Sequence, residues 1–233
     1  MAKVIIFSGA GVSAQSGIST FRDSDGLWEN YDIREICTAG CLDWNRDETV
    51  AFYDKRREDI KDKVPNYAHI KIKELKEKHS DDVAIITQNV DDMFEKAGCE
   101  DVLHLHGFLR EVVCESCGFM DDIGYEKMDD AYSECPECSK PLRPNIVFFG
   151  EAAPRYADLY EELEDCEVLV VIGTSGNVIN TDMFLSRKIK LSVLNNLEPS
   201  AAFNDKRYTK VLYKNATEAI DEIVSDVEEY LSN

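Results

Sequence analysis

Four of the eight cysteines are spaced as two C-x-x-C pairs. Cys114 and Cys117 form the first pair, and Cys135 and Cys138 form the second after 17 intervening residues. This spacing is typical of a zinc ribbon, in which four thiolates saturate tetrahedral Zn²⁺ and leave no position for water. A redox-active pair or a chance occurrence is the alternative, but a redox pair would not need a second copy at this distance. The pattern predicts one structural zinc ion that does no chemistry.

A glycine-rich turn lies near the start of the chain. Gly9 and Gly11 follow the apolar run 4–7 and precede Ser13. Glycines in such a turn let backbone amides at a helix N-terminus approach a pyrophosphate, because no side chain intervenes. A third glycine at the usual spacing is missing, so a tight connection between a strand and a helix explains the turn equally well. The spacing alone leaves both interpretations open.

Polar side chains follow three further predicted strands, at residues 88–91, 173–175 and 196–198. Open parallel sheets bind ligands beyond the C-terminal ends of their strands, so these groups are expected at one edge of a sheet. For the first group, the alternative is a polar turn with a helix cap at Asp91 or Asp92.

Short apolar runs alternate with helical patterns along the chain. The runs span 4–7, 83–87, 146–149, 168–173, 191–194 and, more weakly, 210–213. Helical spacing of apolar residues is found at 68–75, 156–163 and 220–231. This alternation predicts an α/β fold with a Rossmann-like parallel sheet and helices on both faces.

Two segments interrupt the alternation, and we assign both to a small domain. We predict a single catalytic or binding unit over residues 1–233. Its large domain comprises about 1–30, 80–110 and 145–233, and its small domain comprises a helical part at about 31–79 and the zinc ribbon at about 111–144.

The composition excludes several classes of protein. With 26 Lys and Arg against 46 Asp and Glu in 233 residues, the formal net charge is −20. Such a charge repels phosphate backbones, so we expect no nucleic-acid partner. It attracts Lys-rich protein segments, although an acidic surface also favours solubility. No run approaches the roughly 20 apolar residues of a membrane span, and the first apolar run is too short for a signal peptide. We therefore expect a cytoplasmic monomer with no membrane partner.

The segment 9–22 resembles the hallmark of the sirtuins, the NAD-dependent protein-lysine deacylases, which reads G-A-G-x-S-x-x-S-G-I-x-x-F-R. The resemblance continues in order through T-Q-N-V-D at 87–91, L-H-G at 105–107, the cysteine pairs, R-P-N-I-V-F-F-G-E at 143–151, G-T-S at 173–175 and N-L-E-P at 196–199. It spans essentially the whole chain, and it implies NAD as co-substrate and acyl-lysine proteins as partners.

The resemblance also implies the catalytic residues. A histidine beside an apolar strand is more often structural, but the histidine of the sirtuin H-G motif is the general base, which here is His106. Asn89 is implied to orient the attacking water or the ribose. We expect His104 to point to the opposite face of its strand and give it no catalytic role.

By the same resemblance, NAD contacts come from the glycine turn and the loop after it, from T-Q-N-V-D, from two further strand ends and from one helix start. These residues are Gly9, Ala10, Gly11, Ser13, Thr20, Phe21, Arg22, Trp28, Gln88, Asn89, Val90, Asp91, Gly173, Thr174, Ser175, Asn196, Leu197, Glu198 and Ala216.

Tyr53 and Arg56 are three residues apart on a predicted helix and therefore share a face. Composition alone favours a solvated face for such a pair. The pair resembles the Tyr-x-x-Arg of class III sirtuins, whose side chains bind a terminal carboxylate in the acyl pocket. Succinyl- or malonyl-lysine is therefore the expected substrate, with acetyl-lysine as an alternative. The backbone that a substrate peptide joins as an added strand is implied to be that of Val147, Phe148, Phe149 and Gly150.

Two other functions fit parts of the pattern. An NAD glycohydrolase or ADP-ribosyltransferase would use the same pocket, but NAD hydrolysis alone needs no acyl-lysine tunnel. A non-catalytic reader of acyl-lysine or NAD would be expected to lack His106 or Asn89, and both are present. The chain departs from the family pattern at 92–94 and 180–182, and Asp92 is expected to add negative charge near the nicotinamide pocket.

Overall fold

The predicted Rossmann-like sheet is confirmed by the computed structural model, which describes residues 2–19, 32–128 and 132–232. Six strands pair in parallel in the order β3-β2-β1-β7-β8-β9. They are β1 (Val4–Ser8), β2 (Val83–Thr87), β3 (Leu103–His104), β7 (Val168–Ile172), β8 (Leu191–Asn196) and β9 (Lys210–Tyr213).

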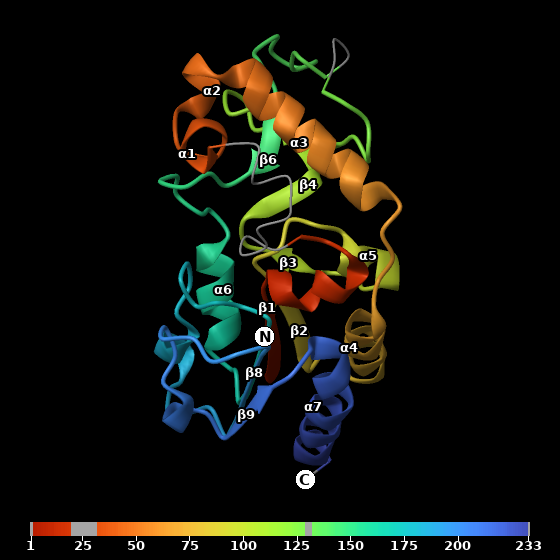
Figure 1. Ribbon diagram of the computed structural model, residues 1–233, viewed down its shortest axis with the longest axis vertical. Helices are drawn as coiled ribbons and strands as arrows, with labels where there is room; N and C mark the ends of the chain where they lie inside the picture. Colours follow the sequence, from red (N-terminus) through yellow and green to blue (C-terminus); the bar gives the residue numbers. More distant parts are fainter. Residues whose placement is uncertain (1, 20–31, 129–131, 233) are drawn as a thin grey trace.

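The central strands are apolar on both faces, because both faces of the sheet are covered. Val4 and Ile6 of β1 belong to one core cluster, whereas Ile5 and Phe7 belong to another. Helices α4 (Tyr67–Lys78) and α7 (Ala216–Leu231) contribute to the first cluster, and α6 (Tyr156–Leu163) contributes to the second (Figure 1). Alternation of side chains between two buried faces therefore explains why these strands are continuous hydrophobic runs in the sequence.

A second, three-stranded antiparallel sheet has the order β5-β4-β6. Its strands are β4 (Gly107–Val113), β5 (Met120–Asp122) and β6 (Arg143–Ile146), and the helices α1 (Ile33–Ile36), α2 (Cys41–Trp44) and α3 (Arg46–Lys61) lie beside it (Figure 1). The remaining helices among the described residues are α5 (Met93–Ala97) and the short 3₁₀ segments η1 (Ala10–Val12), η2 (Ala14–Ser16), η4 (Thr181–Phe184) and η5 (Asp205–Arg207).

The predicted strand at 146–149 is wrong. Only Ile146 belongs to a strand, and that strand is antiparallel to β4 rather than part of the parallel sheet. The Val147 N–H donates to the His106 carbonyl and the Phe149 N–H to the Cys37 carbonyl, both at 2.9 Å. The segment is an apolar, extended connection bonded to loops, which its sequence pattern does not distinguish from a buried strand.

Helix α4 differs from its expected place in the small domain. Its apolar residues Ala68, Ile72 and Leu75 pack in the core of the parallel sheet together with α7. The 3.6-residue period of apolar residues predicts the helix, but it does not predict whether the apolar face packs on the parallel sheet or in the small domain. The other domain boundaries stay a prediction. Among the described residues, none of the helices has the length and apolar character needed to cross a membrane.

Candidate active site

The glycines of the first turn allow the loop after β1 to pack closely against the loop after β7. The Gly11 N–H donates to the Gly173 carbonyl at 2.8 Å, and a Cβ on Gly11 would lie 2.7 Å from the Gly173 Cα. Gly173 itself has φ +65°, which disfavours any side chain there. The chain continues into the three-residue segment η1 rather than a long α-helix. The close approach explains why both positions are glycines, and the turn directs Ala10 into a cavity. The contact of this turn with a pyrophosphate stays a prediction.

The cavity has a volume of about 280 Å³. Many of the predicted site residues line it, and they come from five separate segments of the sequence. They are Ala10, Tyr53, Arg56, Gln88, Asn89, Val90, Asp91, His106, Val147, Phe148, Phe149 and Gly150. Sequence reasoning missed further lining residues, which are Ile18, Ser19, Cys37, Ile146, Glu151, Ala153, Tyr156 and Val178.

His106 is held at both ring nitrogens. Its Nδ1 lies 3.1 Å from the Gln88 carbonyl oxygen, and its Nε2 lies 3.1 Å from the Tyr156 hydroxyl. A carbonyl only accepts hydrogen bonds, so Nδ1 carries the proton and Nε2 keeps its lone pair. Burial lowers the pKa of His106, which the Gln88 carbonyl partly opposes. The ring is thus a neutral base whose lone pair lies at the cavity.

His104 does not point to the opposite face of its strand from His106, contrary to expectation. Residues two apart on an extended chain share a face, and the His104 Nδ1 bonds the Asn89 carbonyl at 2.8 Å while its Nε2 contacts the Glu95 carboxylate at 2.9 Å. Burial opposes its charge, but the bonds to Glu95 and the Asn89 carbonyl raise the pKa of His104. His104 therefore supports the backbone of the loop that carries Asn89.

Three buried side chains fix the T-Q-N-V-D loop. The Asn89 amide donates to the Ser13 hydroxyl at 3.2 Å, and that hydroxyl donates to the Asp91 carboxylate at 3.3 Å. The Asp91 carboxylate also accepts from the Met93 N–H at 3.1 Å, as in the helix-cap alternative. Burial raises the pKa of Asp91, and these hydrogen bonds oppose the shift. The Gln88 amide reaches Thr174 at 2.9 Å, which connects the ends of β2 and β7.

His69 is a further member of this network that the sequence did not indicate. It is the third residue of α4, where its Nδ1 accepts from the Asn66 N–H at 3.3 Å in a capping box. Its Nε2 lies 3.4 Å from the Ser13 hydroxyl. Burial lowers its pKa to about 4, so it is neutral and donates to Ser13. The sequence signal for this contact was the spacing of a capping box: Asn66 is followed three positions later by His69, whose side chain can accept a hydrogen bond.

The acyl side of the cavity is built by α3 and the segment after β6. Tyr53 is 2% exposed, its ring stacks on Phe148 at 5.6 Å, and its hydroxyl donates to the Cys37 Sγ at 3.1 Å. Arg56 lines the same cavity. Burial lowers the pKa of the Arg56 guanidinium, which the nearby Tyr53 and Asp91 partly oppose. The solvated-face alternative is therefore wrong for this pair.

The position of the segment 147–150 is fixed by an ion pair between Arg143 and Glu151. The two guanidinium nitrogens of Arg143 donate to the two oxygens of Glu151 at 2.7 and 3.0 Å, and Glu151 also accepts from the Phe148 N–H at 2.8 Å. A bidentate pair fixes direction as well as position. Phe148 is buried, whereas Phe149 is 46% exposed.

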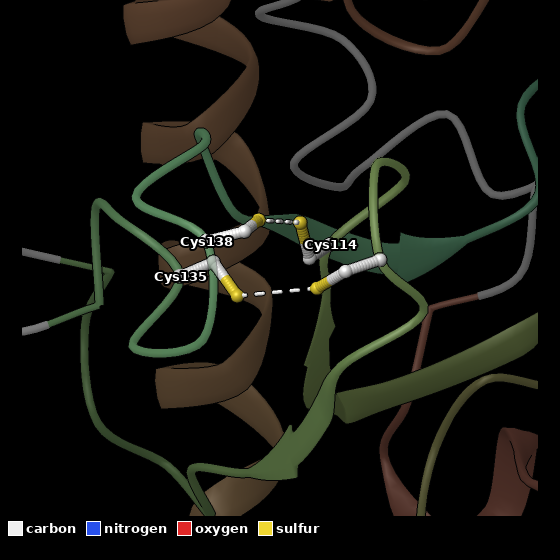
Figure 2. Close-up of side chains that lie close together, drawn as sticks. Cys114, Cys135 and Cys138 are labelled. Carbon is white, nitrogen blue, oxygen red and sulfur yellow. Dashed lines mark hydrogen bonds between the residues drawn. The ribbon is translucent and has the colours of Figure 1, made fainter.

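The two C-x-x-C pairs converge in one cluster (Figure 2). The sulfurs of Cys114 and Cys138, and those of Cys117 and Cys135, are 3.5 Å apart, and all four lie within 4.8 Å of one another. Zinc–sulfur bonds of about 2.3 Å in a tetrahedron require sulfurs roughly 3.8 Å apart. Four thiolates at these distances fit one structural zinc ion, as predicted.

Comparisons with known proteins show the family of this chain. A sequence model of the Sir2 family matches residues 9–180. The chain belongs to the Sir2 family. An "NAD-dependent protein deacylase" of Campylobacter jejuni is 46% identical over 234 residues, which cover 100% of this chain and 99% of the relative. A protein of the same name from Helicobacter hepaticus is 38% identical over 255 residues and covers 99% of both chains.

Solved structures of Sir2 proteins have the same fold. The crystal structure of a Sir2 homologue–NAD complex superposes with a TM-score of 0.84 at 32% identity and covers 98% of this chain and 90% of that chain. A structure described as the structural basis of sirtuin substrate affinity has a TM-score of 0.80 at 27% identity, with 96% and 93% covered.

Several predicted NAD contacts of this Sir2 chain lie away from the cavity or outside the described residues. Thr20, Phe21, Arg22 and Trp28 fall outside the residues that the structure describes. Among the described residues, the ones that do not line the cavity are Gly9, Gly11, Ser13, Gly173, Thr174, Ser175, Asn196, Leu197, Glu198 and Ala216. Leu197 is 70% exposed and Ala216 packs in the core. Their roles in binding NAD stay predictions.

Asp92 lies beside the cavity-lining Asp91, and its predicted effect on the nicotinamide pocket stays a prediction. Within the described part of the chain, Asp92 does not line the cavity. Its side chain is fully buried, accepts a hydrogen bond from Tyr125, and lies 3.5 Å from Lys96 and 3.8 Å from Arg110. These two cations compensate the carboxylate, which connects α5 to the second sheet.

Proposed function

We propose that this chain uses NAD to remove acyl groups from protein lysines, releasing nicotinamide and 2′-O-acyl-ADP-ribose, with succinyl and malonyl preferred to acetyl. The full-length relatives named NAD-dependent protein deacylase support the reaction. The observation that carries the acyl preference is that His106, Tyr53 and Arg56 line one cavity. A base and a pair of carboxylate-binding groups therefore act on the same bound substrate.

His106 and Asn89 perform the proton and positioning steps. NAD, when bound, supplies a ribose carbon from which nicotinamide can leave. The Nε2 lone pair of His106 accepts a proton from a ribose hydroxyl, and the Gln88 carbonyl stabilises the imidazolium that results. Asn89 is fixed by Ser13, so its amide orients the ribose or the attacking water without first being ordered. The polar ends of β1 and β2 at this cavity are chemically suited to a sugar and its hydroxyls.

Arg56 and Tyr53 select the acyl group. Arg56 is half-buried, and burial lowers the pKa of its guanidinium, so an anion that pairs with it offsets the hydration that it has lost. Succinyl- and malonyl-lysine carry such a carboxylate and acetyl-lysine does not. Charge-assisted hydrogen bonds of this kind contribute about 1.5–3 kcal/mol. An enzyme that only hydrolyses NAD would need neither side chain.

The test is mass spectrometry of one peptide sequence carrying succinyl-, malonyl- or acetyl-lysine, incubated with the protein with and without NAD. We expect NAD-dependent removal of succinyl and malonyl to outpace removal of acetyl, and all three to be lost in His106→Ala. A preference for acetyl-lysine would overturn the acyl assignment. Consumption of NAD without deacylation would instead favour the glycohydrolase or transferase function.

A further inference from the structure

We propose that Tyr156 is a positioning residue for His106, and that its hydroxyl occupies Nε2 of this base until a substrate hydroxyl takes its place. The catalytic consequence rests on the proposed function, but the contact is a property of the free protein. The motifs that resemble the sirtuins end at Glu151 before this region and resume at Gly173, so nothing in them assigns Tyr156 a role.

Tyr156 is the first residue of α6, and both its backbone and its ring are held in place. Its N–H donates to the Ala153 carbonyl at 3.2 Å, and its ring packs at the edge of the core cluster that contains the buried Leu159. The centroids of the Tyr156 and His106 rings are 6.1 Å apart with the planes tilted by 45°, so the two rings meet through the hydroxyl. The 3.1 Å contact between oxygen and Nε2 is a normal hydrogen-bond distance.

The direction of this hydrogen bond follows from the other nitrogen. Because Nδ1–H donates to the Gln88 carbonyl, Nε2 is the acceptor and the phenol is the donor. Burial raises the pKa of Tyr156, so the phenol keeps its proton. A donor on the lone pair stabilises the neutral imidazole and disfavours its protonation. Any hydroxyl that His106 deprotonates must displace Tyr156 from the same lone pair.

The other titratable groups facing the cavity have different partners. They are Cys37, Tyr53, Arg56, Asp91 and Glu151. Tyr53 bonds Cys37, Asp91 bonds Ser13, and Glu151 pairs with Arg143. His104 and Glu95 pair with each other beyond the Gln88–Asn89 backbone. Among the described side chains, Tyr156 is thus the one that contacts the His106 Nε2.

The experiment is an NMR titration of the histidine rings in the full chain, with His106 assigned by its absence in His106→Asn. In Tyr156→Phe, which loses one oxygen and keeps the ring, we expect the pKa of His106 to rise by about half a unit to one unit. The low-pH limb of kcat/KM for deacylation should move in the same direction by the same amount. Tyr160→Phe, one turn further along α6 and 55% exposed, is the matched control and should shift neither.

An unchanged His106 pKa in Tyr156→Phe would overturn the proposal, whatever the activity. A shifted pKa in a protein that deacylates no peptide would uphold the contact while contradicting the proposed function. A shift of equal size in Tyr160→Phe would show a general effect of α6 and would also overturn the proposal.

Discussion

The hydroxyl of Tyr53 donates to the sulfur of Cys37 at 3.1 Å, inside the cavity that also contains Arg56. This proton is therefore directed to a thiol and not to a carboxylate. Burial raises the pKa of Cys37, which the Tyr53 hydroxyl partly opposes, so the thiol stays neutral and is a weak acceptor. A substrate carboxylate would be the better partner for the same phenol.

Replacement of Cys37 tests this competition. Cys37→Ala removes the weak acceptor and adds room beside Tyr53, so the ratio of desuccinylation to deacetylation should rise by roughly 3- to 10-fold. Parallel kcat/KM measurements on matched peptides give the ratio. Cys41→Ala is the control, because Cys41 is also buried and, among the described residues, is absent from the cavity lining. An equal change in both variants would contradict the competition.

Arg56 provides a second, independent test of acyl selection. Arg56→Met keeps the length of the side chain and removes the charge, so desuccinylation should fall by roughly 10- to 100-fold, while deacetylation should change by less than about threefold. Lys55→Met, on the exposed side of the same helix, should leave both rates within about twofold. If both activities fell together in Arg56→Met, Arg56 would serve the fold or NAD rather than the acyl group.

The stability contributed by His104 should depend on pH. The bonds of His104 to Glu95 and to the Asn89 carbonyl raise its pKa despite burial, so its charged form is favoured in the folded protein. The contribution should be complete below the ordinary histidine pKa of about 6.5 and be lost as the pH rises through the folded-state value.

Urea unfolding of the wild type and His104→Gln measures this contribution. The difference in unfolding free energy should be about 1–2 kcal/mol at pH 5.5 and clearly smaller at pH 8.5. A difference that grew with pH would mean that His104 acts in its neutral form.

The sequence predicts those features that depend on local periodicity or short spacing. The run at 4–7 is a buried strand because both of its faces are covered, and the helical spacing at 68–75 lies within α4. The cysteine pairs predict the zinc site from spacing alone, because two C-x-x-C pairs at the spacing of a zinc ribbon are rarely found in other kinds of site.

The sequence does not predict contacts that depend on how distant segments pack. Cys37 enters the cavity because α1 lies beside α3, and Tyr156 reaches His106 across 50 positions in sequence. Neither relation leaves a periodic signal. The strand prediction for 146–149 was wrong because the hydrogen-bond partners of this segment lie in loops that are distant in the sequence. The contacts of Asp92 were missed as well, because Tyr125 and Arg110 approach it from the second sheet and its surroundings, although Lys96 is only four residues away on α5.

Loss of one zinc ligand should unfold the second sheet without opening a cavity. Cys117 is the exposed member of the cluster, so Cys117→Ser removes a sulfur ligand and almost no packing. Cys114 and Cys135 are buried beside Val112 and Leu142, and the three remaining thiols cannot replace the bonds that the metal supplies. We expect the zinc content to fall from about one ion per chain to below about 0.2, and Tm to fall by roughly 10 °C or more.

Metal analysis and thermal unfolding with and without a chelator measure both effects. Chelation should lower the Tm of the wild type to that of Cys117→Ser and leave the variant unchanged. Cys99→Ala, which lies in the core of the parallel sheet, should lose stability but keep its zinc and its response to the chelator. A Cys117→Ser protein that retained a full zinc ion would show that three sulfurs suffice and that the fourth position is open to another ligand.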